Sequence, residues 1–255
     1  MTSISTAPTD YTAAPDLLKG RVILVTGAGD GIGRAAAMAF AAHGATVILL
    51  GKTIAKLEAV YDEIEDAGYP QPAIYPLKLG GATYEDYETL AETIDKEFGR
   101  LDGLLHNAGT LGYLKSILDT TPNEWNEVLN VNLTSNFLLT KALLPLLAKS
   151  DGASIVFTSS SVGRKGRAFW GAYAVSKFGV EGLCQILADE IDTTTNIRVN
   201  CINPGATNTT MRRLAYPGEN PGKNPLPEQI MPVYLYLMGT DSKGVTGQSF
   251  DAQKK

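Results

Sequence analysis

The sequence predicts a doubly wound α/β fold, with about seven mostly parallel strands in one sheet and helices on both of its faces. Two observations predict it. Apolar runs of strand length alternate along the chain with longer segments of helical periodicity, as expected of a sheet built from crossover units. These runs are continuously apolar, which is typical of parallel strands that helices cover on both faces.

Each element is predicted from its own residue pattern. The expected strands are residues 21–26, 45–50, 73–77, 101–109, 153–161, 197–205 and 247–253. The expected helices are residues 34–44, a segment ending near 67, and residues 84–98, 121–149, 173–192 and 230–238. Thr121 is expected to cap its helix, with Pro122 in the first turn and Glu124 near the positive end of the helix dipole.

The chain is expected to form one domain, because no repeat or linker divides it. Residues 1–16 contain mostly Thr, Ser, Ala and Pro and have little to bury, so they predict a flexible arm before a domain at 17–255. Residues 206–230 are rich in Pro and Gly and lack strand or helix periodicity. Such a loop beside a cleft is usually a lid or specificity element, and is otherwise a disordered insertion.

Composition favours a small-molecule role. The chain has 255 residues, of which 44% are apolar, and its formal net charge of −5 argues against nucleic acid or an anionic membrane as a main partner. Its two cysteines show no metal-ligand spacing, so no metal site is expected. The first residues resemble no signal peptide, and no segment has the apolar length of a membrane span, which together predict a cytoplasmic protein.

A glycine-rich turn joins the first expected strand to the first expected helix. In TGAGDGIG, Gly27 permits the tight turn, Gly31 lets the backbone approach a pyrophosphate, and Gly33 allows the helix to pack on the sheet. The helix N-terminus then offers N–H groups to the anion. This strand, turn and helix make the predicted fold Rossmann-like and predict a dinucleotide cofactor.

The end of the second strand indicates which dinucleotide is bound. An acidic residue there usually holds the ribose hydroxyl of NAD, whereas a basic residue suits the 2′-phosphate of NADP. Gly51 and Lys52 follow the strand, and no carboxylate appears before Glu58. NADP is therefore favoured over NAD, the alternative being that Lys52 is an ordinary solvated lysine.

Tyr173 and Lys177 lie four residues apart on an expected helix, and so on one face of it. An ammonium beside a phenol favours the phenolate, which predicts a lowered pKa and a general acid or base. The alternative is a lysine that simply packs over an aromatic ring.

Other polar residues occur in apolar surroundings. His106 and His43 lack a carboxylate or nucleophile at a useful spacing, so packing or surface roles are favoured over general-base roles. Asn130, Asn132 and Asn136 interrupt an apolar helix, and a buried amide there must be hydrogen-bonded.

Taken together, TGAGDGIG, HNAG, VNL, SSSVG, YAVSK and NPG resemble the short-chain dehydrogenase/reductase family in order and spacing. The resemblance covers nearly the whole chain from Gly20 onward. The phrases FTSSSVGR, WGAYAVSKF, RVNCINPG, IMPVYLYLMG and FDAQ look similar to one branch of it, the YciK-type bacterial oxidoreductases.

The resemblance implies a catalytic tetrad. Tyr173 would be the acid/base, and Lys177 would lower its pKa and hold the nicotinamide ribose. Asn132 would anchor a water that relays protons to Lys177. Ser160 would polarise the substrate, with the adjacent Ser159 and Ser161 as alternatives in the run of three serines.

It also implies a cofactor site for NADP(H) or NAD(H), formed by the glycine turn, the ends of later strands, and Tyr173 and Lys177. Its expected residues are Gly27, Asp30, Gly31, Ile32, Gly33, Lys52, Asn107, Ala108, Gly109, Tyr173, Lys177, Pro204, Gly205, Thr207 and Thr209. Two departures from the family pattern place contacts in doubt: Lys78 stands where many members have an adenine-binding Asp, and the chain ends FDAQKK instead of in a glycine-bearing tail.

The implied activity is NAD(P)-dependent hydride transfer between nicotinamide and a carbonyl or alcohol substrate, with NADPH favoured. The alternative is a non-catalytic NADP(H)-sensing binding protein on the same fold. An apolar pocket is expected from Leu111, Phe169, Trp170, Met211, Leu214 and Tyr216. Family members are commonly oligomers, so a homodimer or homotetramer is expected.

Overall fold

The structure, a computed structural model, describes residues 4–5, 8–191 and 195–254. Its centre is an eight-stranded sheet in the order β1-β8-β7-β6-β5-β2-β3-β4, and every neighbouring pair is parallel. The strands are β1 (Ile4–Ser5), β2 (Val22–Thr26), β3 (Thr46–Gly51), β4 (Ala73–Pro76), β5 (Gly103–His106), β6 (Ser154–Thr158), β7 (Arg198–Asn203) and β8 (Ser249–Asp251).

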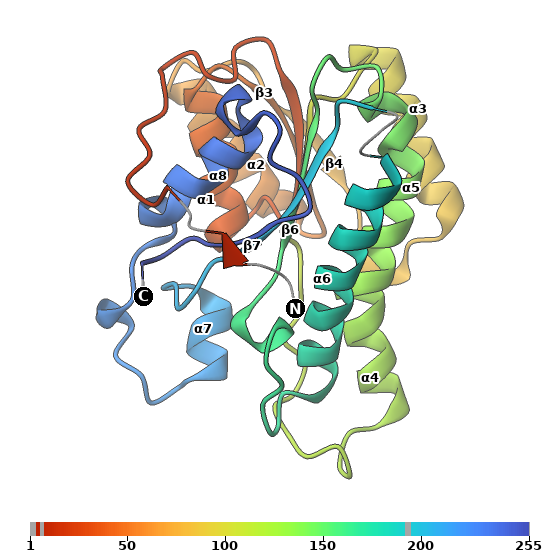
Figure 1. The fold of residues 1–255 in the computed structure, drawn as a ribbon, viewed down its shortest axis with the longest axis vertical. Coiled ribbons are helices and arrows are strands. Elements are labelled where there is room, and N and C mark those ends of the chain that lie inside the picture. The colour runs from red at the N-terminus through yellow and green to blue at the C-terminus, as the bar shows by residue number, and fades with distance from the viewer. Residues whose placement is uncertain (1–3, 6–7, 192–194, 255) are drawn as a thin grey trace.

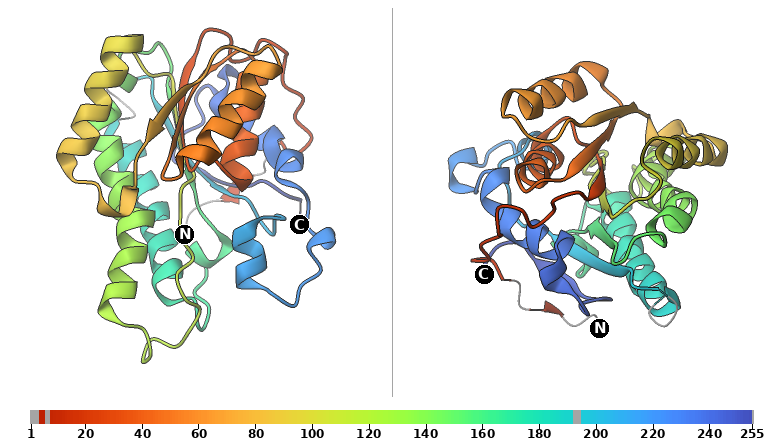
Figure 2. Two further views of the ribbon diagram at one scale, coloured as in Figure 1. Left: turned by 180° about the vertical axis from the view of Figure 1, so that it is seen from behind. Right: turned by 90° about the horizontal axis from the view of Figure 1, so that it is seen from above.

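Helices cover both faces of this sheet (Figures 1 and 2). One layer holds α1 (Gly31–Ala42), α2 (Ile54–Asp66) and α8 (Met231–Met238). The other holds α3 (Tyr84–Phe98), α4 (Pro122–Leu129), α5 (Ser135–Leu147) and α6 (Gly171–Ile191). A π-helical turn, η2 (Asn130–Thr134), joins α4 to α5.

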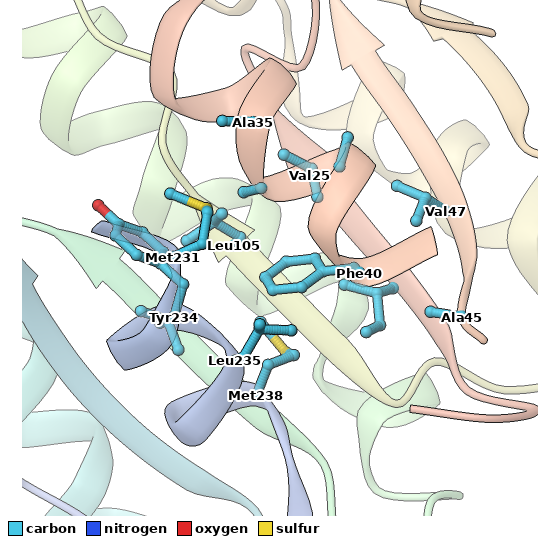
Figure 3. Close-up of a cluster of buried hydrophobic side chains, with 14 of the residues drawn as sticks. Val25, Ala35, Phe40, Ala45, Val47, Leu105, Met231, Tyr234, Leu235 and Met238 are labelled. Atoms are coloured by element: carbon cyan, nitrogen blue, oxygen red, sulfur yellow. The ribbon is translucent and has the colours of Figure 1, made fainter. Parts of the chain in front are cut away.

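Alternate residues of each strand face alternate layers, which gives the protein two cores. On β2, Ile23 and Val25 pack with α1 and α8, whereas Leu24 faces α3 and α5. Figure 3 shows the first core, where Phe40 of α1 lies among side chains from α8 and the sheet. Burial on both faces explains why the strands are continuously apolar.

The seven expected strands are all present, and the expected helices are found with ends shifted by a few residues. Thr121 caps α4 through a capping box with Glu124, as predicted. The segment predicted as one helix over 121–149 contains the π-helical turn. The expected end of α6 at Asp192, like Lys255, lies outside the described residues.

Two segments contain local structure that the sequence patterns did not predict, while the flexibility of residues 1–16 stays a prediction. The arm predicted to be flexible contributes β1, which pairs with β8, and Tyr11, which donates a hydrogen bond of 2.9 Å to Asp241. Residues 206–230, predicted to lack helices, contain α7 (Thr210–Ala215), which Thr209 caps by accepting from the Arg212 backbone N–H. That capping side chain is the local signal that the periodicity argument missed.

The chain leaves β2 toward β3 on one side and reaches β5 on the other, so β2 and β5 flank the point where strand order reverses. Ligands of open α/β sheets bind at the carboxyl ends of the strands beside such a point. Thr26 ends β2 and His106 ends β5. The expected site residues follow these strand ends and their neighbours.

Candidate active site

The glycine turn after β2 has the close packing that was expected of it. Gly27 has a φ of +68°, in the left-handed region that favours glycine. A Cβ on Gly33 would lie 2.1 Å from the Gly27 carbonyl oxygen, so no other residue fits there. Ile32 lies half-buried in the first turn of α1. The turn is held tight against the N-terminus of α1, where backbone N–H groups can receive an anion.

Thr26, which sequence reasoning missed, connects this turn to the end of β5. Its hydroxyl accepts hydrogen bonds of 3.0 Å from the backbone N–H groups of Asn107 and Ala108. The Asn107 amide donates to the Thr26 carbonyl. A buried threonine between a strand and a glycine turn was the available signal. Two segments about 80 residues apart in sequence are thereby fixed side by side.

The segment after β7 lies against the same turn. A Cβ on Gly31 would lie 3.4 Å from Thr209 Cγ2, so Thr209 borders the glycine turn. Gln253 near the C-terminus donates to the carbonyl of Pro204 at 2.8 Å and to Thr207 Oγ1 at 3.2 Å. Its side chain also approaches Gly205. The unusual FDAQ ending therefore supports this segment, a role that the sequence left uncertain.

The charged cofactor candidates lie nearer to solvent. Asp30 precedes α1 and forms an ion pair of 2.5 Å with Lys56, which lowers the pKa of Asp30. Lys52 follows β3 and is exposed, as is Lys78 beyond β4. Asp30 was predicted as a cofactor contact without its lysine partner, which lies 26 residues later in the sequence.

Tyr173 and Ser160 are brought together at the start of α6. Tyr173 is 9% exposed, and its hydroxyl hydrogen-bonds with the Ser160 side chain. Burial raises the pKa of Tyr173 to about 12, although the Ser160 hydrogen bond acts in the opposite direction. Burial and Ser160, not Lys177, are the causes of this shift, so the expectation that Lys177 lowers the pKa of Tyr173 stays a prediction.

Lys177 lies one turn further along α6, where it is 4% exposed. Its Nζ atom is 5.7 Å from the centre of the Tyr173 ring and donates a hydrogen bond of 2.7 Å to the carbonyl of Thr158. Burial lowers the pKa of Lys177 to about 8, opposed by the nearby Cys201 and Glu181. The Lys177 Nζ atom is thus held at the end of β6, close to the Tyr173 ring.

Asn132 is fully buried in the π-helical turn. Its side chain accepts from the Thr110 N–H at 2.8 Å and donates to the Thr110 carbonyl at 2.9 Å and to Ser176 Oγ at 3.0 Å. The predicted need for a satisfied amide is confirmed. A Cβ on Gly109 would lie 3.4 Å from Asn132 Oδ1 and 3.9 Å from Lys177 Nζ, so Gly109 borders both residues.

The three serines after β6 have different environments. Ser159 is buried and donates a hydrogen bond of 2.5 Å to Glu181, whereas Ser161 is exposed. Ser160, between them, is the one whose hydroxyl bonds with Tyr173. This geometry favours Ser160 among the three alternatives.

A buried ionic network, which the sequence did not predict, contacts this serine segment through Ser159. Arg164 contacts Glu181 of α6 at 3.2 Å and Asp251 of β8 at 2.6 Å, and it also donates to Ser249 Oγ at 2.6 Å. The three charged side chains are 15%, 6% and 16% exposed. Because Glu181 also accepts from Ser159, the network ties the serine segment to α6 and β8.

An apolar wall and an aromatic cluster adjoin Tyr173. Leu111, Trp170 and Met211 pack against the buried cluster that contains Tyr173, in agreement with the expected apolar pocket. Phe169 and Leu214, expected in the same pocket, are 63% and 71% exposed.

The histidines do not belong to this site. His106 is stacked on Phe157 and hydrogen-bonds through Nε2 with Thr140 at 2.8 Å, and burial lowers its pKa to about 3. His43 Nδ1 lies 2.7 Å from the Ala39 carbonyl on α1. Both have the packed or surface roles that were favoured.

Two features are absent from the described residues. No helix there combines the length and the apolar character needed to cross a bilayer. Histidine, cysteine and carboxylate side chains in the same residues do not gather in threes at a spacing that could hold a metal ion.

Comparison with known proteins identifies the family. Residues 21–220 match the short chain dehydrogenase family. The chain belongs to this family. It is therefore an oxidoreductase with the Rossmann-like short-chain dehydrogenase fold, as its motifs implied.

Individual relatives agree with this assignment. The chain is 54% identical to an uncharacterised oxidoreductase, YciK of Escherichia coli strain K12, over 95% of this chain and 96% of that protein. A short-chain dehydrogenase structure from Pseudomonas syringae is 60% identical, with a TM-score of 0.94 over 96% of this chain and 99% of that one. Another, from Escherichia coli CFT073 in complex with NADPH, is 54% identical, with a TM-score of 0.92 over 95% and 100% of the two chains.

Proposed function

We propose that this oxidoreductase transfers a hydride between NADP(H) and a carbonyl or alcohol substrate, with Tyr173 as the acid/base. The observation that carries the proposal is the buried group at the end of β6. There the Ser160 hydroxyl hydrogen-bonds with the Tyr173 phenol, and the Lys177 Nζ atom lies 5.7 Å from the centre of the phenol ring. A phenol and a hydroxyl converging on one point suit a carbonyl oxygen.

The residues would divide the work as follows. The bound nicotinamide supplies or accepts the hydride at its C4 atom. Ser160 donates a hydrogen bond that steadies the developing oxyanion, and Tyr173 gives that oxygen its proton. A phenol is protonated at neutral pH, so Tyr173 can act as the acid when a carbonyl is reduced. Lys177 would hold the nicotinamide ribose. A water anchored by Asn132 would relay protons to Lys177 and so restore the proton that Tyr173 gives up.

The chain fits a dinucleotide at the carboxyl ends of β2, β5 and β7. The carbonyl of Gly27 occupies the space that a Cβ on Gly33 would need, which brings bare backbone to the N-terminus of α1. Asn107 to Gly109 and Pro204 to Thr209 flank this turn. NADPH is the favoured cofactor because Lys52 follows β3 without a neighbouring carboxylate and because a relative binds NADPH in its crystal structure.

Replacing Lys52 with alanine is expected to weaken NADPH selectively. An exposed lysine that pairs with a 2′-phosphate contributes only when that phosphate is present, so the KM for NADPH should rise about tenfold and the KM for NADH should change little. Lys96→Ala, an exposed lysine on α3, is the matched control. Equal changes in both KM values would contradict a contact between Lys52 and the 2′-phosphate of NADPH.

A non-catalytic NADP(H)-sensing protein is the alternative function. It predicts nucleotide binding without consumption of NADPH in the presence of any carbonyl compound. The presence of both Tyr173 and Lys177 in a buried arrangement favours the enzyme. Turnover of any aldehyde, ketone or quinone at the expense of NADPH excludes the sensor.

A homo-oligomer is also proposed, built through α5 and α6. Apolar side chains stay exposed on these helices: Phe137, Val175, Phe178 and Ile186 are 48%, 45%, 44% and 58% exposed. Ile186→Glu should lower the mass measured by light scattering toward 27.2 kDa. Ile54→Glu, on α2 of the opposite layer, should leave the mass unchanged, and a wild-type mass of one chain would contradict the proposal. A cytoplasmic location stays a prediction that cell fractionation can test.

A further inference from the structure

The two segments beside the Tyr173 cluster carry a local excess of positive charge. Residues 164–171 and 206–224 together contain six basic side chains and one acidic one, although the whole chain has a net charge of −5. Arg167 and Tyr216 join these segments through a hydrogen bond of 2.6 Å. A positive field at the mouth of a site raises the local concentration of anionic ligands.

Arg167 and Tyr173 both lie beside the Trp170 ring. Its guanidinium carbon lies 5.8 Å from the centre of the Trp170 ring and 5.7 Å from the centre of the Tyr216 ring. The Trp170 ring lies in turn 5.7 Å from the Tyr173 ring, centre to centre. The aromatic faces orient the guanidinium, so its remaining N–H groups are available in a defined place.

Some cations of this region are neutralised, whereas Lys165, Arg213 and Lys223, like Arg167, have no carboxylate within 4.0 Å among the described residues. Arg212 forms a bidentate pair with Glu219 at 2.6 Å, and Lys115 pairs with Glu124. Across residues 4–5, 8–191 and 195–254, no carboxylate lies within 4.0 Å of the Arg167 guanidinium. Arg167 thus lies over Trp170, whose ring adjoins Tyr173, without a carboxylate partner, while its neighbour Arg212 is neutralised by Glu219.

We infer that the substrate is a carbonyl compound bearing a carboxylate, which Arg167 binds while the carbonyl group lies against Tyr173 and Ser160. The inference rests on the proposed function and specifies its substrate class. The planar fork of a guanidinium that has no carboxylate partner in the protein matches the two oxygens of a substrate carboxylate. The width of the Trp170 ring separates the two ends, so several carbon atoms lie between carbonyl and carboxylate.

Matched pairs of straight-chain oxo acids and their methyl esters test this inference. The wild-type enzyme with NADPH should show a kcat/KM about tenfold higher for the oxo acid of the best length than for its ester. Arg167→Gln should abolish this preference, by raising KM for the acid, and leave the Kd for NADPH unchanged. Lys165→Gln, an exposed lysine of the same segment, should keep the preference.

Binding without turnover separates this inference from the proposed function. Quenching of tryptophan fluorescence in the Tyr173→Phe variant saturated with NADPH reports binding of the same acids and esters. Tighter binding of acids, lost in Arg167→Gln/Tyr173→Phe, supports the carboxylate even when no compound is turned over. Esters that bind or react as well as acids, or an Arg167→Gln variant that weakens both equally or weakens NADPH, would overturn it.

Discussion

Replacing Tyr173 with phenylalanine should lower kcat by a factor of about 10²–10⁴, the usual contribution of a positioned general acid. The phenyl ring keeps the packing of a side chain that is 9% exposed, while the hydroxyl that bonds with Ser160 is lost. The Kd for NADPH should therefore stay nearly unchanged. Stopped-flow measurement of NADPH consumption, together with fluorescence titration of NADPH binding, checks both halves of this expectation.

The matched control is Tyr87→Phe. Tyr87 is also buried, but its hydroxyl donates to the Leu79 carbonyl in the core around α3, far from the proposed chemistry in the fold. This variant should retain wild-type kcat. If Tyr173→Phe turned over at the wild-type rate, the proton would come from another group and the assignment of Tyr173 would fail.

Replacing Arg164 with leucine should destabilise the protein by about 3–5 kcal/mol, the cost typical of breaking a buried ion pair from one side. Arg164 is the guanidinium that Glu181 and Asp251 share, and the exposed fractions of all three side chains are 16% or less. Without Arg164, the carboxylates of Glu181 and Asp251 stay largely buried but lose the guanidinium that neutralises them. Urea unfolding followed by circular dichroism measures the change.

An exposed ion pair provides the control for this stability effect. Lys149 contacts Asp95 at 2.6 Å, but both side chains are about half exposed, so Lys149→Ala should cost no more than about 1 kcal/mol. Equal losses of stability in Arg164→Leu and Lys149→Ala would show that the buried network contributes no more to the free energy of unfolding than an exposed ion pair. The network also supports Ser159, so Arg164→Leu should reduce kcat as well.

The arrangement of strands and the glycine turn could be predicted because their signals are local. Apolar runs such as those of β2 and β3 predicted strands that the structure contains, and the spacing of Gly27, Gly31 and Gly33 predicted the tight turn before α1. The strand β1 was missed because two residues are too few to show a periodic pattern. The helix α7 was missed because its main local signal is one capping side chain, Thr209.

The environment of the proposed catalytic residues could not be predicted in the same way. The four-residue spacing of Tyr173 and Lys177 suggested a lowered tyrosine pKa, but the pKa depends on burial by segments far away in sequence, and burial raises it. Likewise, Arg164 meets Asp251 across 87 residues, and Gln253 meets Pro204 across 49. Contacts of this kind depend on the assembled sheet, which no local pattern encodes.

Transfer of deuterium from NADPH labelled at C4 tests the central claim most directly. The protein would be incubated with NADPH that carries deuterium in both C4 positions and with a panel of oxo acids, aldehydes and ketones, and the products analysed by mass spectrometry. The expected result is an alcohol that carries one deuterium on its carbinol carbon, formed by the wild-type protein and at least a hundredfold more slowly by Tyr173→Phe. Tight NADPH binding with no deuterium in any product, or equal transfer by the variant, would contradict it.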